Sequence, residues 1–366
     1  MKLVAVALSW LLAMDVLVAQ SRSAANAVQR GGAPNIASLL VGLVPAKTIA
    51  LPGDVDSNSP AVWDLVGGQN TMIVLTSFAG RPSRALGSLA GLTPAMPVAL
   101  HPWPGGGVWL EAVVPAHDGT WYGYYHNEIV ATECGDESKV VPRIGAARST
   151  DHGATWVDLG ILMASPSSSY VCNTHNRYFV GGVGDLSVVL DRNGQFLYMY
   201  FSEYGPTGDK QGVGVARMAW GDRDNPIGRL DVWNHGAWLP MRGVEFDDAT
   251  PIFLSTRHWH DADSVVDAYW GPTVHWNEYL ERYVMLLNRA ADESFSQEGI
   301  YLSMTTNIEE PASWSPPTKI MDGGQWYPQV IGTEEGLGTD KLAGREARFF
   351  VSGRSEYVIR FNKAGF

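Results

Sequence analysis

The sequence lacks several features that mark common classes of protein. It contains no run of about 18 or more apolar residues, the length that a membrane-spanning helix needs. It also has no P-loop, no GxSxG motif and no dinucleotide-binding fingerprint, because Gly181-Gly-Val-Gly184 leads into an expected strand and not out of one into a helix. The sequence therefore predicts no membrane span, and it gives no support to nucleotide or cofactor chemistry.

Positive charge is also scarce. Lys and Arg number 26 against 38 Asp and Glu, which gives a net charge of -12. This balance argues against nucleic acids and anionic membrane surfaces as partners, because both would be repelled. A neutral partner fits better, and the 14 Trp, 14 Tyr and 11 Phe suit stacking on carbohydrate as well as packing in a β-rich core.

Cysteine is rare, with only Cys134 and Cys172. Residues 1–25 have the layout of a secretory signal peptide, with a basic Lys2, an apolar run over Leu3–Ala13 and small residues after it. Because an even cysteine count in an oxidising compartment favours pairing, we expect a Cys134–Cys172 disulfide, with two buried free thiols as the alternative. The sequence thus predicts a secreted protein, extracellular or periplasmic, with residues 26–45 as a linker or N-terminal arm.

Strand-turn-strand patterns are abundant. In Gly181–Tyr204 an apolar strand that opens at Asp185 is followed by an Asp191-Arg-Asn-Gly194 turn and a second, alternating strand. Similar patterns occur five times, which is typical of β-hairpins repeated around an axis. The five expected inner strands align on a shared valine or its equivalent: Asn58–Trp63, Trp109–Val114, Gly184–Val189, Trp270–His275 and Trp326–Ile331.

We therefore expect residues 46–366 to form an all-β domain, a five-bladed β-propeller of four-stranded antiparallel blades. A strand over Lys47–Leu51 would close the ring against the last blade. Ser149–Trp156, an SxDxGxTW pattern, resembles the Asp-box turn of sialidases and other propellers, and we interpret it as structural. A six-bladed ring with a degenerate blade within Pro206–Asp267 is the alternative.

Acidic residues stand at the starts of several expected inner strands. Asp56 precedes the first, Glu111 lies in the second and Asp185 opens the third. Strand starts of all blades converge on the axis of a propeller, and glycoside hydrolysis needs two carboxyl groups that face one site. The expected substrate-binding residues near the same rim are His126, Glu128, Arg177, Glu203, Trp270, His275 and Tyr327.

The blade pattern resembles the five-bladed propeller glycosidases of the arabinanase, invertase and levansucrase group. Asp185-Leu-Ser-Val-Val-Leu-Asp-Arg-Asn-Gly194 is similar to the DPSVFxDxDG stretch of glycoside hydrolase family 43. In that family an Asp on the first blade is the base, an Asp on the third tunes the acid, and a Glu in an EGP motif on the fourth blade donates the proton. The resemblance implies the third-blade role for Asp185.

The chain departs from the family at the other two positions. The first-blade motif is Ser59-Pro60, so the base would be displaced to Asp56, and the fourth-blade motif is Trp270-Gly-Pro272, without the acid. We take Glu111 as the first choice of acid and the His258/His260/Asp263 loop as the second. Without any acid, the chain would be a non-catalytic glycan-binding propeller, and a purely structural scaffold is a third reading.

The loop around His258 holds the densest set of possible metal ligands: His258, His260, Asp261 and Asp263. Their spacing matches no closed zinc pattern, so we predict no transition-metal site and no cofactor. A Ca²⁺ ion held by carboxylates on the axis stays open at this point. The sequence as a whole favours a secreted glycoside hydrolase.

Overall fold

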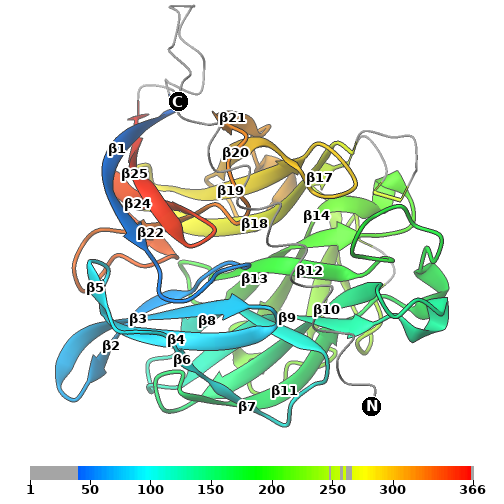
Figure 1. Cartoon of the computed structure of the whole chain (residues 1–366), viewed down its shortest axis with the longest axis horizontal. Helices are drawn as coiled ribbons and strands as arrows, with labels where there is room; N and C mark the ends of the chain where they lie inside the picture. The colour runs from blue at the N-terminus through cyan, green and yellow to red at the C-terminus, as the bar shows by residue number, and fades with distance from the viewer. Residues whose placement is uncertain (1–39, 247–248, 256–258, 261–265, 364–366) are drawn as a thin grey trace, which may run out of the picture. The chain divides into compact units, whose positions relative to one another are not determined.

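The computed structural model describes residues 40–246, 249–255, 259–260 and 266–363, and their strands form five sheets arranged as the blades of a propeller (Figure 1). The prediction of five blades is confirmed. The six-bladed alternative is wrong, because the described strands between Pro206 and Asp267 all belong to the third sheet. The five innermost strands overlap the expected ones, with the first and last beginning three residues later: β2 Ala61–Val66, β8 Gly107–Pro115, β12 Val183–Leu190, β18 Ala268–Asn277 and β22 Gln329–Gly332.

Each blade continues outward from its innermost strand in antiparallel order. The second strands are β3 Gln69–Phe78, β9 Trp121–Val130, β13 Phe196–Tyr204, β19 Arg282–Ala290 and β24 Glu346–Val351. The outer strands are β4 Arg81–Ser88, β5 Gly91–Leu92, β10 Val140–Ser149, β11 Thr155–Met163, β14 Gln211–Ala219, β15 Leu230–Asn234, β20 Gln297–Thr305, β21 Thr318–Asp322 and β25 Arg354–Phe361.

Short additional strands widen four of the sheets, and two of them, β7 and β23, pair in parallel. They are β6 Met96–Pro97, β7 Ala99–His101, β16 Ala237–Pro240, β17 Phe253–Leu254 and β23 Leu342–Ala343. Single 3-10 turns lie in the connections: η1 Thr132–Cys134, η2 Ser167–Ser169, η3 Gly208–Lys210, η4 Trp220–Asp222 and η5 Pro311–Ser313. No helix in the described ranges is long and apolar enough to cross a membrane.

The ring closes between the two ends of the described chain. Strand β1 Val41–Ala50 pairs antiparallel with β25, so that Val41 lies opposite Phe361 (blue beside red in Figure 1). The closing strand therefore begins inside residues 26–45, which we expected to be an arm. The expected signal peptide, residues 1–25, lies outside the described residues. The closing pair covers the outer edge of β25 and makes β1 the outermost strand of the last blade.

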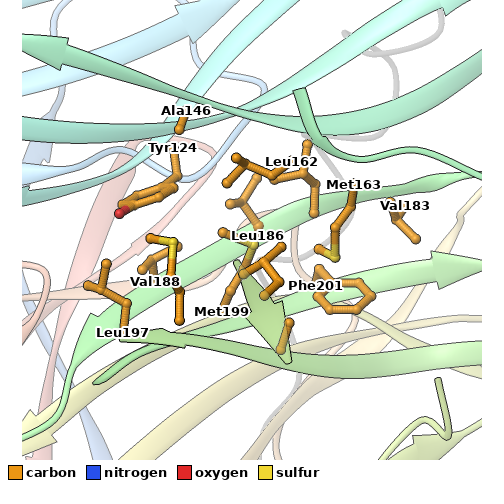
Figure 2. Packing of buried hydrophobic residues seen from close by; sticks show 14 of the residues in the cluster. Tyr124, Ala146, Leu162, Met163, Val183, Leu186, Val188, Leu197, Met199 and Phe201 are labelled. Atoms are coloured by element: carbon orange, nitrogen blue, oxygen red, sulfur yellow. The ribbon is translucent and has the colours of Figure 1, made fainter. Parts of the chain in front are cut away.

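The blades are held face to face by apolar packing. Figure 2 shows this between the second and third blades, where Leu186 on β12 and Met199 and Phe201 on β13 face Leu162 and Met163 on β11. All five side chains are buried, and burial of apolar surface contributes roughly 25 cal/mol per Å². This packing fixes the start of β12, and with it Asp185, relative to the neighbouring blade.

Two local features confirm sequence expectations. Cys134 and Cys172 form a disulfide that joins the connection between β9 and β10 to the segment before β12. In the Asp-box turn, Asp151 Oδ1 accepts hydrogen bonds from the N–H groups of Ala154 and Thr155 at 3.0 and 2.9 Å, and Trp156 is 2% exposed. The turn thus ties the β10–β11 hairpin and does not take part in the site described below.

We predict that Asp151→Ala lowers the free energy of unfolding by about 1–2 kcal/mol, because two backbone N–H groups and the hydroxyl of Thr155 lose their common acceptor. Chemical denaturation would measure this. Asp322→Ala, whose carboxylate is almost fully exposed, serves as the control and should stay within about 0.5 kcal/mol of the parent. Equal effects of the two substitutions would contradict a structural role for the Asp-box.

Candidate active site

Asn58, just before β2, connects three other blades at the centre of the ring. Its Nδ2 donates to the carbonyl oxygens of Leu186 at 2.9 Å and Pro272 at 3.2 Å, and lies 3.5 Å from Glu111 Oε2. These partners belong to β12, β18 and β8. Because Asn58 is 3% exposed, its amide is a buried crosslink between the innermost strands. The site lies around the starts of these strands.

Beside this crosslink, Glu111, His126 and Asp185 form a buried cluster. One side-chain N or O atom of each lies within 4.8 Å of the other two, and the residues are 1%, 3% and 4% exposed. Backbone groups at the start of β12 hold them: the N–H of Leu186 donates to Glu111 Oε2 at 2.7 Å, and the N–H of Asp185 donates to His126 Nδ1 at 2.9 Å. The cluster is therefore built by contacts between the second and third blades.

Asp185 lies at a strained position of the backbone. Its φ is +40°, a left-handed value that non-glycine residues rarely adopt, and it coincides with a register shift in the pairing of β12 with β13. The hydroxyl of Tyr204 donates to Asp185 Oδ2 at 2.5 Å. Burial raises the pKa of Asp185, while His126 and the hydroxyls of Tyr204 and Tyr327 oppose that shift.

Burial and the charge of Asp185 raise the pKa of Glu111 well above its ordinary value. The closeness of the two carboxyl groups disfavours the state in which both are ionised. One short hydrogen bond reaches the Glu111 carboxyl group: its Oε2 accepts from the N–H of Leu186. A carboxyl group at this depth shapes the electrostatics of the cluster but, at 1% exposure, has almost no surface with which to touch a substrate.

Two opposing effects act on the pKa of His126. Burial lowers its pKa, but the hydrogen bond with Glu128 and the charges of Asp185, Glu128 and Glu111 raise it to about 9. At the same time Nδ1 accepts the N–H of Asp185, which requires a lone pair on that nitrogen. In this conformation the ring is therefore neutral and its proton lies on Nε2, 3.2 Å from Glu128 Oε1; a second proton would break the bond to Asp185.

Asp56 lies nearer the surface, in the connection before β2. Its Oδ1 accepts from Trp109 Nε1 at 2.7 Å, and its Oδ2 accepts from the N–H of Ala79 at 3.0 Å. Burial and then the charge of Glu128 raise the pKa of Asp56 to about 6, against the effect of these two donors. Asp56 is therefore a carboxyl group that changes protonation near neutral pH.

Of the remaining predicted residues, Glu128 and Tyr327 lie beside the cluster. Glu128, with a side chain 25% exposed, bonds to His126, and Tyr327 is half-buried beside Asp185, with a pKa raised well above its usual value by burial and then by the charge of Asp185. Arg177 is exposed, with its guanidinium 5.7 Å from the ring centre of the adjacent Tyr178. Glu203 is buried on β13.

Trp270 and His275, both on β18, were expected to contact substrate, but the structure buries them. Trp270 is 2% exposed and packs edge-on against Phe295, Trp326 and Tyr327. His275 is 1% exposed, packs near Phe361, and has its pKa lowered to about 3 by burial and by the charge of Lys341. Both are core side chains, so neither offers a surface to a sugar.

Glu111, His126 and Asp185 are the described residues that could hold a cation, given the spacing of their ligand atoms. The donor set is already engaged, however, since Nδ1 of His126, Oε2 of Glu111 and Oδ2 of Asp185 each have a hydrogen-bond partner within the protein. Of the other expected cluster, His258, Asp261 and Asp263 lie outside the described residues. His260 is buried, with Nδ1 2.6 Å from the hydroxyl of Thr174.

Sequence reasoning overlooked three residues of the site. Asn58, Trp109 and Tyr204 carry no charge, so a search for paired acids passed over them, although the first two stand at the starts of inner strands. Their position in the strand alignment was a usable signal for Asn58 and Trp109. Tyr204 ends the second strand of the third blade, and only the pairing of β12 with β13 brings its hydroxyl to Asp185.

The chain is similar to several solved structures. A Bacillus subtilis arabinanase aligns over 85% of this chain and 95% of its own, with 14% identity and a TM-score of 0.46. An endo-arabinase from Bacteroides thetaiotaomicron aligns over 86% of this chain and 96% of its own, with 12% identity and a TM-score of 0.47. An N-acetylgalactosamine deacetylase from F. plautii aligns over 88% of this chain and 96% of its own, also with 12% identity and a TM-score of 0.47. The sequence matches no family model and no curated protein. Function is therefore argued from the site itself.

We predict that Tyr204→Phe lowers the free energy of unfolding by about 1.5–3 kcal/mol at neutral pH, because the buried Asp185 carboxylate loses a donor. Tyr198→Phe is a matched control: Tyr198 lies on the same strand, is fully buried, and its hydroxyl makes no hydrogen bond to a carboxylate in the described structure. Chemical denaturation across pH would compare the two.

The difference between the two variants in free energy of unfolding should become smaller as the pH falls. Tyr204 stabilises the ionised form, so its contribution is present while Asp185 is charged and is lost as Asp185 is protonated. A constant difference at every pH would mean that Tyr204 acts by packing alone.

Proposed function

We propose that the chain is a secreted glycoside hydrolase that acts on a neutral oligo- or polysaccharide. The observation that carries the proposal is that two partly buried carboxyl groups from neighbouring blades, Asp56 and Glu128, lie close enough for the charge of Glu128 to raise the pKa of Asp56. Glu128 also bonds to His126 of the buried Glu111–His126–Asp185 cluster. Two carboxyl groups in unlike environments are the arrangement that acid–base cleavage of a glycosidic bond requires. The Cys134–Cys172 disulfide supports export, and the net charge of -12 favours a neutral substrate.

Asp56 is assigned as the general acid. Its pKa of about 6 leaves a protonated fraction available near neutral pH, and its protonated form can transfer the proton to the glycosidic oxygen as the bond to the anomeric carbon breaks. This revises the expectation from sequence, in which Asp56 was the base and Glu111 the acid. Glu111 is 1% exposed and would need to leave its bond with Leu186 to reach a substrate.

Glu128 is assigned as the second carboxylate, which either attacks the anomeric carbon or removes a proton from the attacking water. His126 donates from Nε2 to Glu128 and thereby orients its carboxylate. Asp185 acts through His126: its own N–H holds Nδ1, which fixes the proton on the Nε2 side. In this assignment Glu111, His126 and Asp185 position the reacting groups and do not touch the substrate.

A glycan-binding propeller without activity is the second candidate. It is favoured by Trp270, which is buried among aromatic rings at the start of β18, where the resemblance to family 43 places the acid. A binder needs aromatic surface and hydrogen-bonding groups but no proton donor.

We expect Asp56→Asn and Glu128→Gln each to lower kcat by about 10²–10⁴-fold, the usual contribution of acid–base catalysis. The measurement is hydrolysis of aryl glycosides and of neutral plant and algal oligosaccharides by the purified mature chain. Asp54→Asn, an exposed acid two positions away, is the control and should keep the parent rate. Full activity in either of the first two variants would remove that residue from the mechanism.

The pH profile tests the assignment of the acid. With Asp56 as proton donor, kcat/KM of the parent should fall as the pH rises through about 6, because the donor is then deprotonated. Asp56→Asn should lose this limb and should retain more activity on glycosides with good leaving groups, which need no proton. No turnover on any substrate, together with saturable oligosaccharide binding in calorimetry, would establish the binding propeller instead.

A further inference from the structure

Two surface loops meet beside the Asp56–Glu128 pair and carry aromatic side chains. The first is the β3–β4 turn, where the N–H of Ala79 donates to Asp56 and the preceding Phe78 is 40% exposed. The second is the loop before β8, which carries Trp103. Its Gly106 has a φ of +62° and packs so closely on Glu128 that an added Cβ would lie 1.8 Å from the Glu128 carbonyl oxygen. Each loop thus adjoins one of the two carboxyl residues.

Arg81 links the two loops. It pairs with Phe78 across the β3–β4 turn, and its guanidinium lies 4.9 Å from the ring centre of Trp103. Arg81 is exposed and forms no ion pair with a carboxylate in the described part of the chain. A guanidinium with free donors next to two aromatic side chains suits the binding of a sugar. The C–H groups of the sugar can lie on the aromatic rings, while its hydroxyl oxygens accept hydrogen bonds from the guanidinium.

The loop that carries Trp103 is held in place by hydrogen bonds from Asn127, Arg143 and Trp103 itself. Asn127, fully buried on β9 between His126 and Glu128, donates from Nδ2 to the carbonyl oxygens of Gly105 and Gly107, both at 2.7 Å. Arg143 donates to Asn127 Oδ1 at 2.6 Å and to the Pro104 carbonyl at 3.0 Å. Trp103 itself donates from Nε1 to the Gly106 carbonyl at 3.1 Å. A surface loop fixed in this way loses little entropy when a ligand binds.

We propose that Phe78, Arg81 and Trp103 form a subsite for a second, neutral sugar ring of the glycan, next to the ring whose bond is cleaved. The proposal rests on the proposed function and adds to it that the substrate is at least a disaccharide. A neutral sugar is favoured over an acidic one because the net charge of -12 and the carboxylates of Asp56 and Glu128 repel a polyanion.

The experiment compares two substrates of the same sugar in the full-length mature protein: a linear neutral oligosaccharide, which has a second ring, and the glycosyl fluoride, which has none. We expect Phe78→Ala and Arg81→Ala to lower the ratio of kcat/KM for the oligosaccharide to kcat/KM for the fluoride by about five- to tenfold. Leu65→Ala, which removes a side chain 64% exposed on β2 of the same blade, should leave the ratio unchanged.

The outcomes separate this subsite from the hydrolase assignment. An active parent whose ratio does not change in either variant overturns the subsite and leaves the hydrolase standing. A parent that cleaves nothing but binds neutral oligosaccharides in calorimetry, with about five- to tenfold weaker binding in Phe78→Ala, supports the subsite and overturns the hydrolase. Tighter binding of a uronate-containing oligosaccharide that is lost in Arg81→Ala overturns the neutral assignment, and a parent that neither cleaves nor binds overturns both.

Discussion

The amide of Asn58 is the interaction on which the centre of this propeller depends. Five innermost strands converge on one axis, and carbonyl oxygens at their starts need donors from outside their own sheets. Asn58 Nδ2 supplies the missing donor to carbonyls of β12 and β18 and approaches Glu111 on β8, so one buried side chain fixes the relative position of four blades. This crosslink therefore sets the relative positions of the strands that carry the residues of the candidate site.

The chain concentrates energetically unfavourable features at the same place. Two carboxyl groups and an imidazole are buried with ligand atoms within 4.8 Å of one another, and Asp185 and Tyr327 both have positive φ values. Buried charge and backbone strain of this kind persist only where the surrounding structure enforces them, and they concentrate at functional sites. The apolar contacts between the second and third blades, seen around Leu186 and Met199 in Figure 2, supply that enforcement.

The acids of this site differ in burial, hydrogen bonding and pKa because of their surroundings more than because of their residue type. Glu111 is enclosed and its pKa is raised well above the ordinary value, Asp185 has a tyrosine hydroxyl as donor, and Asp56 lies near the surface with a pKa of about 6. The same three residues are indistinguishable as acids at strand starts in the sequence. Their order of depth follows from how far each strand start reaches toward the axis, which depends on the closure of the whole ring.

The sequence by itself determined the repeated hairpins, the five inner strands and the position of Asp185 at the start of one of them, because each depends on local alternation or turn residues. It favoured the disulfide through the even cysteine count, and the structure shows the pairing. It also indicated that His126, Glu128 and Tyr327 belong near one rim. Only the tertiary structure decided that Trp270 and His275 are buried, that Glu111 is enclosed, and that Asn58, Trp109 and Tyr204 complete the site. The reason is that strand periodicity tells which face a side chain is on, whereas burial at the axis depends on residues from other blades that approach it across large distances in sequence.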